Sequence, residues 1–249
     1  MKTALVTGAT SGIGEAIAIE LANNNYNLII CGRREEQLKK LQTELSKQVD
    51  VQYLVFDVRD KSSVFEALTP IVESTKIDVL INNAGNAHGM APIQDGDIDD
   101  WDAMIDGNVK GLLYVSKVLT PQMVERKTGH IINIGSIAGK EVYPNGNVYC
   151  ASKHAVDAIN NGMRMDLNQY GVKVSQISPG LVETEFSKVR FKGDENKAAT
   201  VYKGMDALQA KDIADIAMFM ISRPDHVNLS DVIVLPKAQA SSTMVKREE

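Results

Sequence analysis

Cysteine is scarce in this chain, since Cys31 and Cys150 are the only two among 249 residues and stand in unrelated contexts. Two such thiols make no disulfide framework, so we expect them to be reduced and the protein to be cytoplasmic. Apolar runs of 18 residues are also missing, and the run at the start of the chain is too short for a signal peptide. The sequence therefore predicts neither a membrane span nor secretion.

A strong charge of one sign, an abundance of aromatic residues and closely spaced histidines are lacking too. The net charge is −5, and aromatic residues make up 5% of the chain. The mild charge disfavours nucleic acid and anionic membranes as partners, and the few aromatic residues argue against a stacking platform for single strands. The four histidines are scattered without the spacing of metal ligands, so no metal site is expected.

Apolar residues make up 44% of the chain, which is enough for a full core, and short β-branched runs alternate with helical stretches. This alternation is typical of a parallel sheet covered by helices. The expected strands are residues 4–7, 27–31, 51–55, 79–81, 130–134, 173–177 and 232–234. The expected helices are residues 14–23, 35–46, 62–74, 101–125, 148–170 and 211–222. We predict the α/β class, with a single-domain, Rossmann-type doubly wound parallel sheet of about seven strands and helices on both faces.

The predicted domain covers residues 1–235. Within it, residues 184–206 interrupt the alternation with a polar, weakly helical stretch, which is typical of a segment that covers a binding site or is mobile. Residues 236–249 are small and polar with a charged end. We expect this tail to be disordered or to pack on a neighbouring subunit.

A glycine-rich turn follows the first expected strand and opens the first helix. Its glycines follow the spacing G-x-x-x-G-x-G, which is neither a P-loop nor G-x-G-x-x-G. Glycines at this junction let the backbone approach an anion, whose charge is met by the free N–H groups of the helix start. We therefore predict a site for a dinucleotide pyrophosphate, formed by Gly8, Thr10, Ser11, Gly12, Ile13 and Gly14.

The end of the second expected strand indicates which dinucleotide binds. An NAD-selective site usually carries an acidic residue there, which accepts a hydrogen bond from the ribose 2′-hydroxyl. This chain has Arg33 and Arg34 instead, and guanidinium groups are suited to the 2′-phosphate of NADP. The alternative is that both arginines only solvate the next helix beside Glu35 and Glu36. Because the helix dipole disfavours cations at that end, NADP is the preferred interpretation.

Tyr149 and Lys153 are four residues apart, so on a helix their side chains share one face. At an effective dielectric of about 20, a unit charge roughly 4 Å away is worth about 4 kcal/mol. Such a charge would lower the pKa of the phenol by about three units, before desolvation, and suit it to proton transfer near neutral pH. The alternative for this pair alone is a half-buried tyrosine beside a solvent-facing lysine.

The ordered motifs together resemble those of the short-chain dehydrogenase/reductase family, and the resemblance covers residues 1–235. It is carried by the glycine turn, Asn82-Asn83-Ala84-Gly85, Asn108, Ser136, Tyr149, Lys153 and Pro179-Gly180. The resemblance implies that Tyr149 is the general acid/base and that Lys153 lowers its pKa and grips the nicotinamide ribose. It also implies that Ser136 orients the substrate oxygen and that Asn108 helps to hold a water.

Further cofactor contacts follow from the same resemblance. It implies that Asp57 and Val58 flank the adenine, that Asn83 supports the ribose region and that Val182 and Thr184 meet the carboxamide. Ile13 would lie beside the pyrophosphate. Most of these positions are at or just beyond the end of an expected strand, where open α/β sheets bind ligands. The full set is completed by Ala84, Gly85, Pro179 and Gly180.

The stretch around residues 180–194 and the late Leu-Pro-Lys-Ala-Gln-Ala-Ser are similar to the NADP-dependent 3-hydroxy acid dehydrogenases that act on serine and allo-threonine. We expect a small-molecule substrate, held by Ser136, Tyr149 and Arg190, because a guanidinium can clamp a carboxylate. Arg190 and Lys192 could instead be solvent-facing charges. The alternative functions are a 3-oxoacyl or broad-range carbonyl reductase and a non-catalytic dinucleotide-binding scaffold. We also expect a homo-oligomer, preferably a tetramer.

Overall fold

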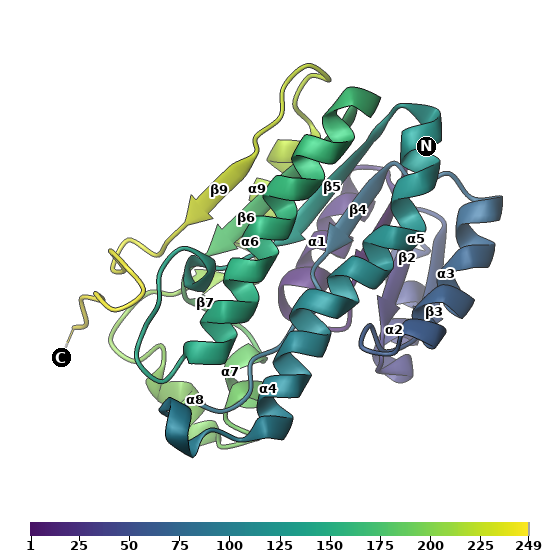
Figure 1. Ribbon diagram of the computed structural model, residues 1–249. Coiled ribbons are helices and arrows are strands. Elements are labelled where there is room, and N and C mark those ends of the chain that lie inside the picture. Colours follow the sequence, from purple (N-terminus) through teal and green to yellow (C-terminus); the bar gives the residue numbers. More distant parts are fainter. Residues whose placement is uncertain (249) are drawn as a thin grey trace.

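The computed structural model describes residues 1–248, and its centre is a parallel sheet (Figure 1). Within the described residues seven strands have the order β3-β2-β1-β4-β5-β6-β9. They are β1 (Thr3–Thr7), β2 (Asn27–Gly32), β3 (Val51–Val55), β4 (Val79–Asn82), β5 (Gly129–Ile134), β6 (Val172–Pro179) and β9 (Asp231–Val234). The central strands β1, β4, β5 and β6 are almost wholly buried, as parallel sheets covered on both faces require. The predicted fold is confirmed.

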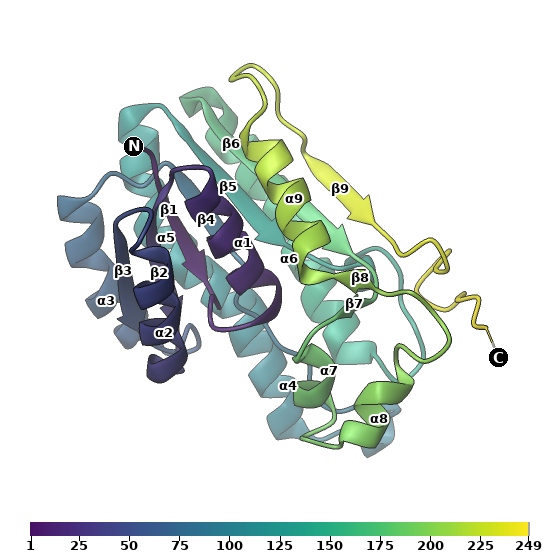
Figure 2. The ribbon, with the colours of Figure 1, turned by 180° about the vertical axis from the view of Figure 1, so that it is seen from behind.

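Helices cover both faces of the sheet. On the face turned forward in Figure 2, α1 (Gly12–Asn23), α2 (Glu35–Leu45) and α9 (Ala210–Ile221) pack over one apolar core. On the opposite face, α3 (Lys61–Ser74), α5 (Gly111–Arg126) and α6 (Asn147–Leu167) cover a second core (Figure 1). This layering leaves the carboxyl ends of the strands as the open edge where a ligand can reach the sheet.

The helix expected over residues 101–125 is longer than predicted and not uniform. It begins as α4 (Ile98–Ile105), where the carboxylate of Asp97 accepts a hydrogen bond of 3.0 Å from the N–H of Asp99. It passes through a π-helical turn, η2 (Asp106–Lys110), and continues as α5. Such single turns occur where a helix must re-aim a side chain, and this one carries Asn108.

The interruption predicted over residues 184–206 is present at the open edge. β7 (Val182–Glu183) and β8 (Leu208–Gln209) pair with each other, and between them lie α7 (Phe186–Arg190) and α8 (Glu195–Thr200). In both ribbon views this segment lies beyond the strand ends, near α4 (Figures 1 and 2). We call residues 184–206 the insertion.

The tail is placed against its own chain, in place of the expected disorder. The side chain of Gln239 accepts a hydrogen bond of 2.9 Å from the N–H of Leu181. Farther along, Arg247 donates to the carbonyl of Val201 at 2.9 Å, and the N–H of Glu248 donates to Gly204 at 2.7 Å. The tail prediction also included residue 249, which lies outside the described residues.

Within residues 1–248, no helix is both long and apolar enough to cross a membrane. The same range contains no cluster of three or more histidine, cysteine, aspartate or glutamate side chains arranged to hold a metal ion.

Candidate active site

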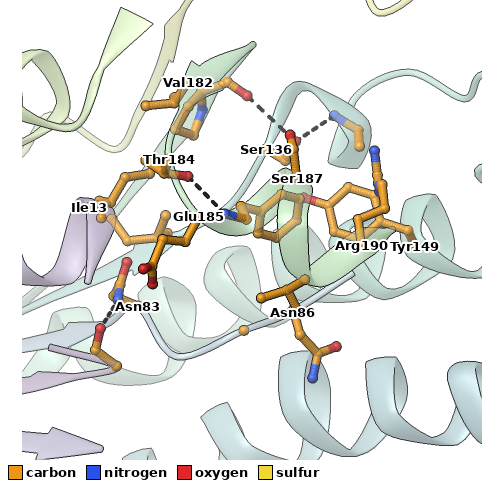
Figure 3. Close-up of a pocket in the computed structure, with 18 of the residues that line it drawn as sticks. Ile13, Asn83, Asn86, Ser136, Tyr149, Val182, Thr184, Glu185, Ser187 and Arg190 are labelled. Carbon is orange, nitrogen blue, oxygen red and sulfur yellow. Dashed lines mark hydrogen bonds between the residues drawn. The ribbon is translucent and has the colours of Figure 1, made fainter. Parts of the chain in front are cut away.

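The carboxyl ends of the central strands open into one cavity of about 780 Å³ (Figure 3). Its size is typical of a pocket for a cofactor together with a small substrate. The expected cofactor residues that line it are Gly8, Thr10, Ser11, Gly12, Ile13, Arg33, Arg34, Asp57, Val58, Asn83, Ala84, Gly85, Pro179, Gly180, Val182 and Thr184. Ser136, Tyr149, Lys153 and Arg190 line the same cavity, whereas Gly14 and Asn108 lie outside its lining as described for residues 1–248.

The glycine turn has the backbone that its sequence predicts. Gly8 and Gly12 have φ values of +66° and +58°, in the left-handed region that favours glycine. Gly14 has a different requirement, because a Cβ there would stand 2.4 Å from the carbonyl oxygen of Gly8. The turn is tied to the end of β4, where Asn83 donates to the carbonyl of Thr7 at 2.9 Å. The result is a rigid cradle at the start of α1 that fits a pyrophosphate.

The two arginines after β2 have different surroundings. Arg34 donates to the side chains of Thr10 and Ser11, and it forms an ion pair of 3.0 Å with Glu185 of the insertion. A hydrogen bond from Arg34, together with its charge, lowers the pKa of Glu185 in spite of slight burial. Arg33 is exposed, and its only ion pair among the described residues is a loose one, 3.6 Å from Asp57. Arg33 is thus the freer cation for a phosphate.

Asp57 has a partner that sequence reasoning did not include. Arg59 forms a two-pronged contact with its carboxylate, with distances of 2.7 to 3.1 Å. Hydrogen bonds from Arg59 and its charge hold the pKa of Asp57 below its usual range, in spite of partial burial. The available signal in the sequence was the position of Arg59, two residues after Asp57. Arg59 is a third arginine in the lining of this part of the cavity.

Tyr149 and Lys153 both lie on α6 and are buried. Lys153 is 7% exposed and donates to the carbonyl of Ile134 at 2.9 Å, so it is not a solvent-facing lysine. Burial lowers its pKa to about 8. Ser136 lies at the end of β5 and accepts a hydrogen bond of 3.1 Å from the N–H of Ala138. A tyrosine, a lysine and a serine therefore converge on one buried wall.

The electrostatics of Tyr149 differ from the prediction. Burial raises the pKa of its phenol, and the charge of Arg190 and a hydrogen bond from Ser136 only partly oppose that rise. Lys153, which was expected to lower this pKa, instead directs its ammonium group to the backbone of β5. Lys153 is not among the groups that lower the pKa of the phenol in this structure, so the tuning of Tyr149 by Lys153 stays a prediction.

Asn108 supports the wall from behind. Its side chain donates to the carbonyl of Asn86 at 2.9 Å and accepts from the N–H of the same residue at 2.7 Å. It also donates to Ser152 at 2.9 Å. At Gly85 a Cβ would stand 2.9 Å from Asn108 and 3.7 Å from the Lys153 ammonium, so these groups meet behind Gly85. The π-helical turn places Asn108 where it can orient that loop.

Arg190 enters the site from α7 and lies beside the ring of Tyr149 (Figure 3). Its guanidinium carbon is 4.7 Å from the centroid of that ring, 5.6 Å from Phe186 and 5.9 Å from Tyr143. It donates to the hydroxyl of Tyr143 at 2.8 Å, while its Nε is buried without a partner among the described residues. Sequence reasoning found Arg190 but missed the two other rings, because only the fold brings them together.

The far wall of the cavity carries the remaining predicted contacts. Val182 is buried, and its carbonyl accepts a hydrogen bond of 2.8 Å from Tyr202. Thr184 packs against the glycine turn, where a Cβ on Gly12 would stand 3.3 Å from its side chain. The insertion therefore contacts both the cofactor half and the tyrosine half of the cavity.

Comparisons with known proteins agree with this geometry. The family described as short chain dehydrogenase matches residues 2–195. The chain is 44% identical over 238 residues, 95% of each chain, to the NADP-dependent 3-hydroxy acid dehydrogenase YdfG of Salmonella typhi. It is 42% identical over 240 residues to sulfoacetaldehyde reductase 2 of Chromohalobacter salexigens, covering 96% of this chain and 95% of that one. The closed form of serine dehydrogenase complexed with NADP⁺ is similar with a TM-score of 0.90 at 40% identity, covering 99% of this chain and 100% of that one.

Proposed function

This chain belongs to the short-chain dehydrogenase family, and we propose that it is an NADP-dependent oxidoreductase that interconverts a small 3-hydroxy acid and its 3-oxo product. The observation that carries the proposal is the position of Arg190 against the ring of Tyr149: it is a half-buried cation whose buried Nε has no partner among the described residues. A guanidinium in that position can bind an acid group while the phenol reaches a hydroxyl nearby on the same small molecule.

The cavity fits NADP in two respects. The glycine turn presents backbone N–H groups at the start of α1, and Arg33 and Arg34 lie where the 2′-phosphate would be recognised. Asp57 and Val58 would border the adenine, and Val182 and Thr184 would border the carboxamide. When bound, the nicotinamide supplies the hydride for reduction or accepts it in oxidation.

The residues of this chain would handle the proton. Because burial keeps the phenol of Tyr149 protonated near neutral pH, Tyr149 is ready to donate to a carbonyl oxygen. Ser136 would orient that oxygen from the opposite side. Lys153, whose pKa is lowered to about 8, can give up a proton near neutral pH and so restore the phenol. Asn108 would hold the loop at Asn86 in its position relative to Lys153.

Relatives of this chain support an anionic substrate in two forms. One is named for 3-hydroxy acids and another for sulfoacetaldehyde, so a carboxylate and a sulfonate are both candidates for the group on Arg190. The same residue argues against a bulky carbonyl substrate, because Arg190, Tyr143 and Phe186 fill the space beside Tyr149. A scaffold without activity would not need a buried lysine and tyrosine on the cavity wall.

The test is an absorbance assay of NADP⁺ reduction with a panel of alcohols. The panel comprises L-serine, D-serine, L-allo-threonine, 3-hydroxypropionate, 2-hydroxyethanesulfonate and a neutral secondary alcohol. We expect turnover of at least one acid. Arg190→Ala should raise KM for that acid about 10-fold to 100-fold, the range of a lost charge-assisted contact, and leave KM for the neutral alcohol nearly unchanged. Equal changes for both substrates would contradict the role of Arg190.

Assembly and compartment are part of the same proposal. Helices α5 and α6 expose apolar side chains, including Leu113 and Met165, on faces turned away from the sheet. An unpartnered apolar helix face favours a closed symmetric oligomer, and we expect a homotetramer in the cytoplasm. Sedimentation of the purified protein would measure its size.

A further inference from the structure

We propose that Lys192 is a positioning residue that fastens the insertion to the start of α4 and thereby holds Arg190 over Tyr149. This inference rests on the proposed function, in which Arg190 binds the acid group of the substrate. Lys192 itself does not line the main cavity as described for residues 1–248. Its effect would act through the backbone that it shares with Arg190.

The contacts of Lys192 join two segments that are distant in the sequence. Its ammonium nitrogen lies 3.2 Å from a carboxylate oxygen of Asp97 and 3.0 Å from one of Asp100. Asp97 caps α4, and Asp100 lies in its first turn with a side chain only 14% exposed. Because one lysine meets two carboxylates on a fixed helix end, the contact has a defined geometry, unlike that of a solitary surface pair.

The backbone of Lys192 is a second, independent observation. Its φ is +51°, in the left-handed region where glycine or asparagine is favoured, and the next residue, Gly193, has a φ of +90°. A lysine in that conformation costs free energy relative to glycine. The ion pairs with Asp97 and Asp100 offset part of this cost.

The turn around Lys192 is held at its other end as well. The carbonyl of Arg190 accepts a hydrogen bond of 2.9 Å from the N–H of Gly89. Gly89 is itself pressed against the helix start, since a Cβ there would stand 2.8 Å from a carboxylate oxygen of Asp100. Residues 190–192 are thus held to residues 89–100 by the carbonyl of Arg190 and by the side chain of Lys192. The guanidinium of Arg190 lies in the aromatic cluster formed by the rings of Tyr143, Tyr149 and Phe186. Among residues 1–248, loss of the Lys192 contact would leave the backbone hydrogen bond to Gly89 as the only polar contact between residues 190–192 and residues 89–100, beside the bond from Arg190 to Tyr143.

Lys188 provides a matched control. It lies in the same insertion, its side chain is 57% exposed like that of Lys192, and it pairs with Glu195 at 3.0 Å. Both members of that pair belong to the insertion, so it does not fasten the insertion to α4. Lys192→Ala and Lys188→Ala therefore each remove one lysine charge from the insertion. Only Lys192→Ala also removes ion pairs between the insertion and α4.

The experiment compares these variants with Lys192→Arg by steady-state kinetics and by hydrogen exchange of residues 186–192. We expect Lys192→Ala to raise KM for the best acid substrate about fivefold, the scale of a partly exposed ion pair, with KM for the neutral alcohol and affinity for NADP⁺ unchanged. Exchange in residues 186–192 should become faster. Lys192→Arg should restore most of both properties, and Lys188→Ala should change neither.

Two outcomes would overturn the inference. One is unchanged exchange in residues 186–192 of Lys192→Ala, and the other is an equal effect of Lys188→Ala. Failure of the proposed function has a different signature, because the unaltered protein would then turn over none of the acids. Hydrogen exchange does not depend on turnover, so it tests whether Lys192 fastens the insertion to α4 even if the unaltered protein turns over none of the acids.

Discussion

Tyr149 and Arg190 form the pair of side chains on which the proposed chemistry of the cavity depends. Burial opposes ionisation of the phenol, and the guanidinium carbon 4.7 Å from its ring favours it. Since burial is the larger influence, the pKa of Tyr149 remains raised. The phenol is therefore in its protonated form before the reaction. If Arg190 moved toward a substrate anion, its pKa-lowering influence on the phenol would weaken, and the protonated form would be favoured further.

Removal of the phenolic hydroxyl tests the proton-transfer role. Tyr149→Phe keeps the ring that packs against Phe186, at a centroid distance of 5.7 Å, and so preserves the wall of the cavity. We expect kcat to fall about 10²-fold to 10⁴-fold, the usual contribution of a general acid, with the affinity for NADPH close to that of the unaltered protein. Single-wavelength kinetics and fluorescence titration measure the two quantities. Substantial residual turnover would defeat the assignment of Tyr149.

At the scale of elements, the site depends on how closely α1 approaches the end of β1. Gly8, Gly12 and Gly14 allow that approach, and Asn83 joins the same turn to the end of β4. The helix start and two strand ends are therefore one rigid unit, which presents its N–H groups without rearrangement when an anion binds.

A methyl group at Gly14 should break this unit. Its Cβ would lie 2.4 Å from the carbonyl oxygen of Gly8 and 2.3 Å from the Asn83 amide, so α1 must move. We expect Gly14→Ala to lower the free energy of unfolding by about 1–3 kcal/mol and to weaken cofactor binding. Gly162→Ala, in the interior of α6, is the control, because its Cβ meets nothing within 4 Å in the described part of the chain. That variant should gain up to about 1 kcal/mol, as measured by urea unfolding, and a destabilised Gly162→Ala would contradict the comparison.

At the scale of the whole molecule, a line of hydrogen-bonded polar side chains crosses the core from β5 to β6 and beyond. His130 bonds to the hydroxyl of Ser175 at 2.8 Å, and that hydroxyl donates to Asn228 at 2.8 Å. The imidazole Nε2 must then be the donor, which leaves Nδ1 buried with no partner among the described residues. Burial, with smaller contributions from Lys173 and Lys2, lowers the pKa of His130 to about 3.

This histidine predicts a pH dependence of folding stability. The unfolded chain binds a proton at His130 near pH 6.5, and the folded chain binds it only near pH 3, so stability must fall as pH decreases between these values. The contribution of one such group is at most about 1.4 kcal/mol per pH unit. His130→Gln, which keeps a donor for Ser175, should flatten the slope of unfolding free energy between pH 6.5 and 4, and the exposed His226→Gln should not. An unchanged slope in His130→Gln would refute this account.

The insertion and the tail also belong to this scale, because together they close the cavity from outside the sheet. The tail contacts the insertion through Arg247, and through Gln239 it contacts Leu181, between β6 and β7. The insertion in turn meets the cofactor half through Glu185 and the start of α4 through Lys192. These contacts connect the two ends of the cavity.

Local periodicity and residue chemistry at strand ends were enough to predict the sheet, the glycine turn and the helix that carries Tyr149 and Lys153. The surroundings of these residues could not be predicted in the same way, because they depend on packing between distant segments. The aromatic cluster around Arg190, the Asp57–Arg59 pair and the course of the tail are contacts between separate segments. The raised pKa of Tyr149 likewise follows from burial, which depends on how the whole chain packs.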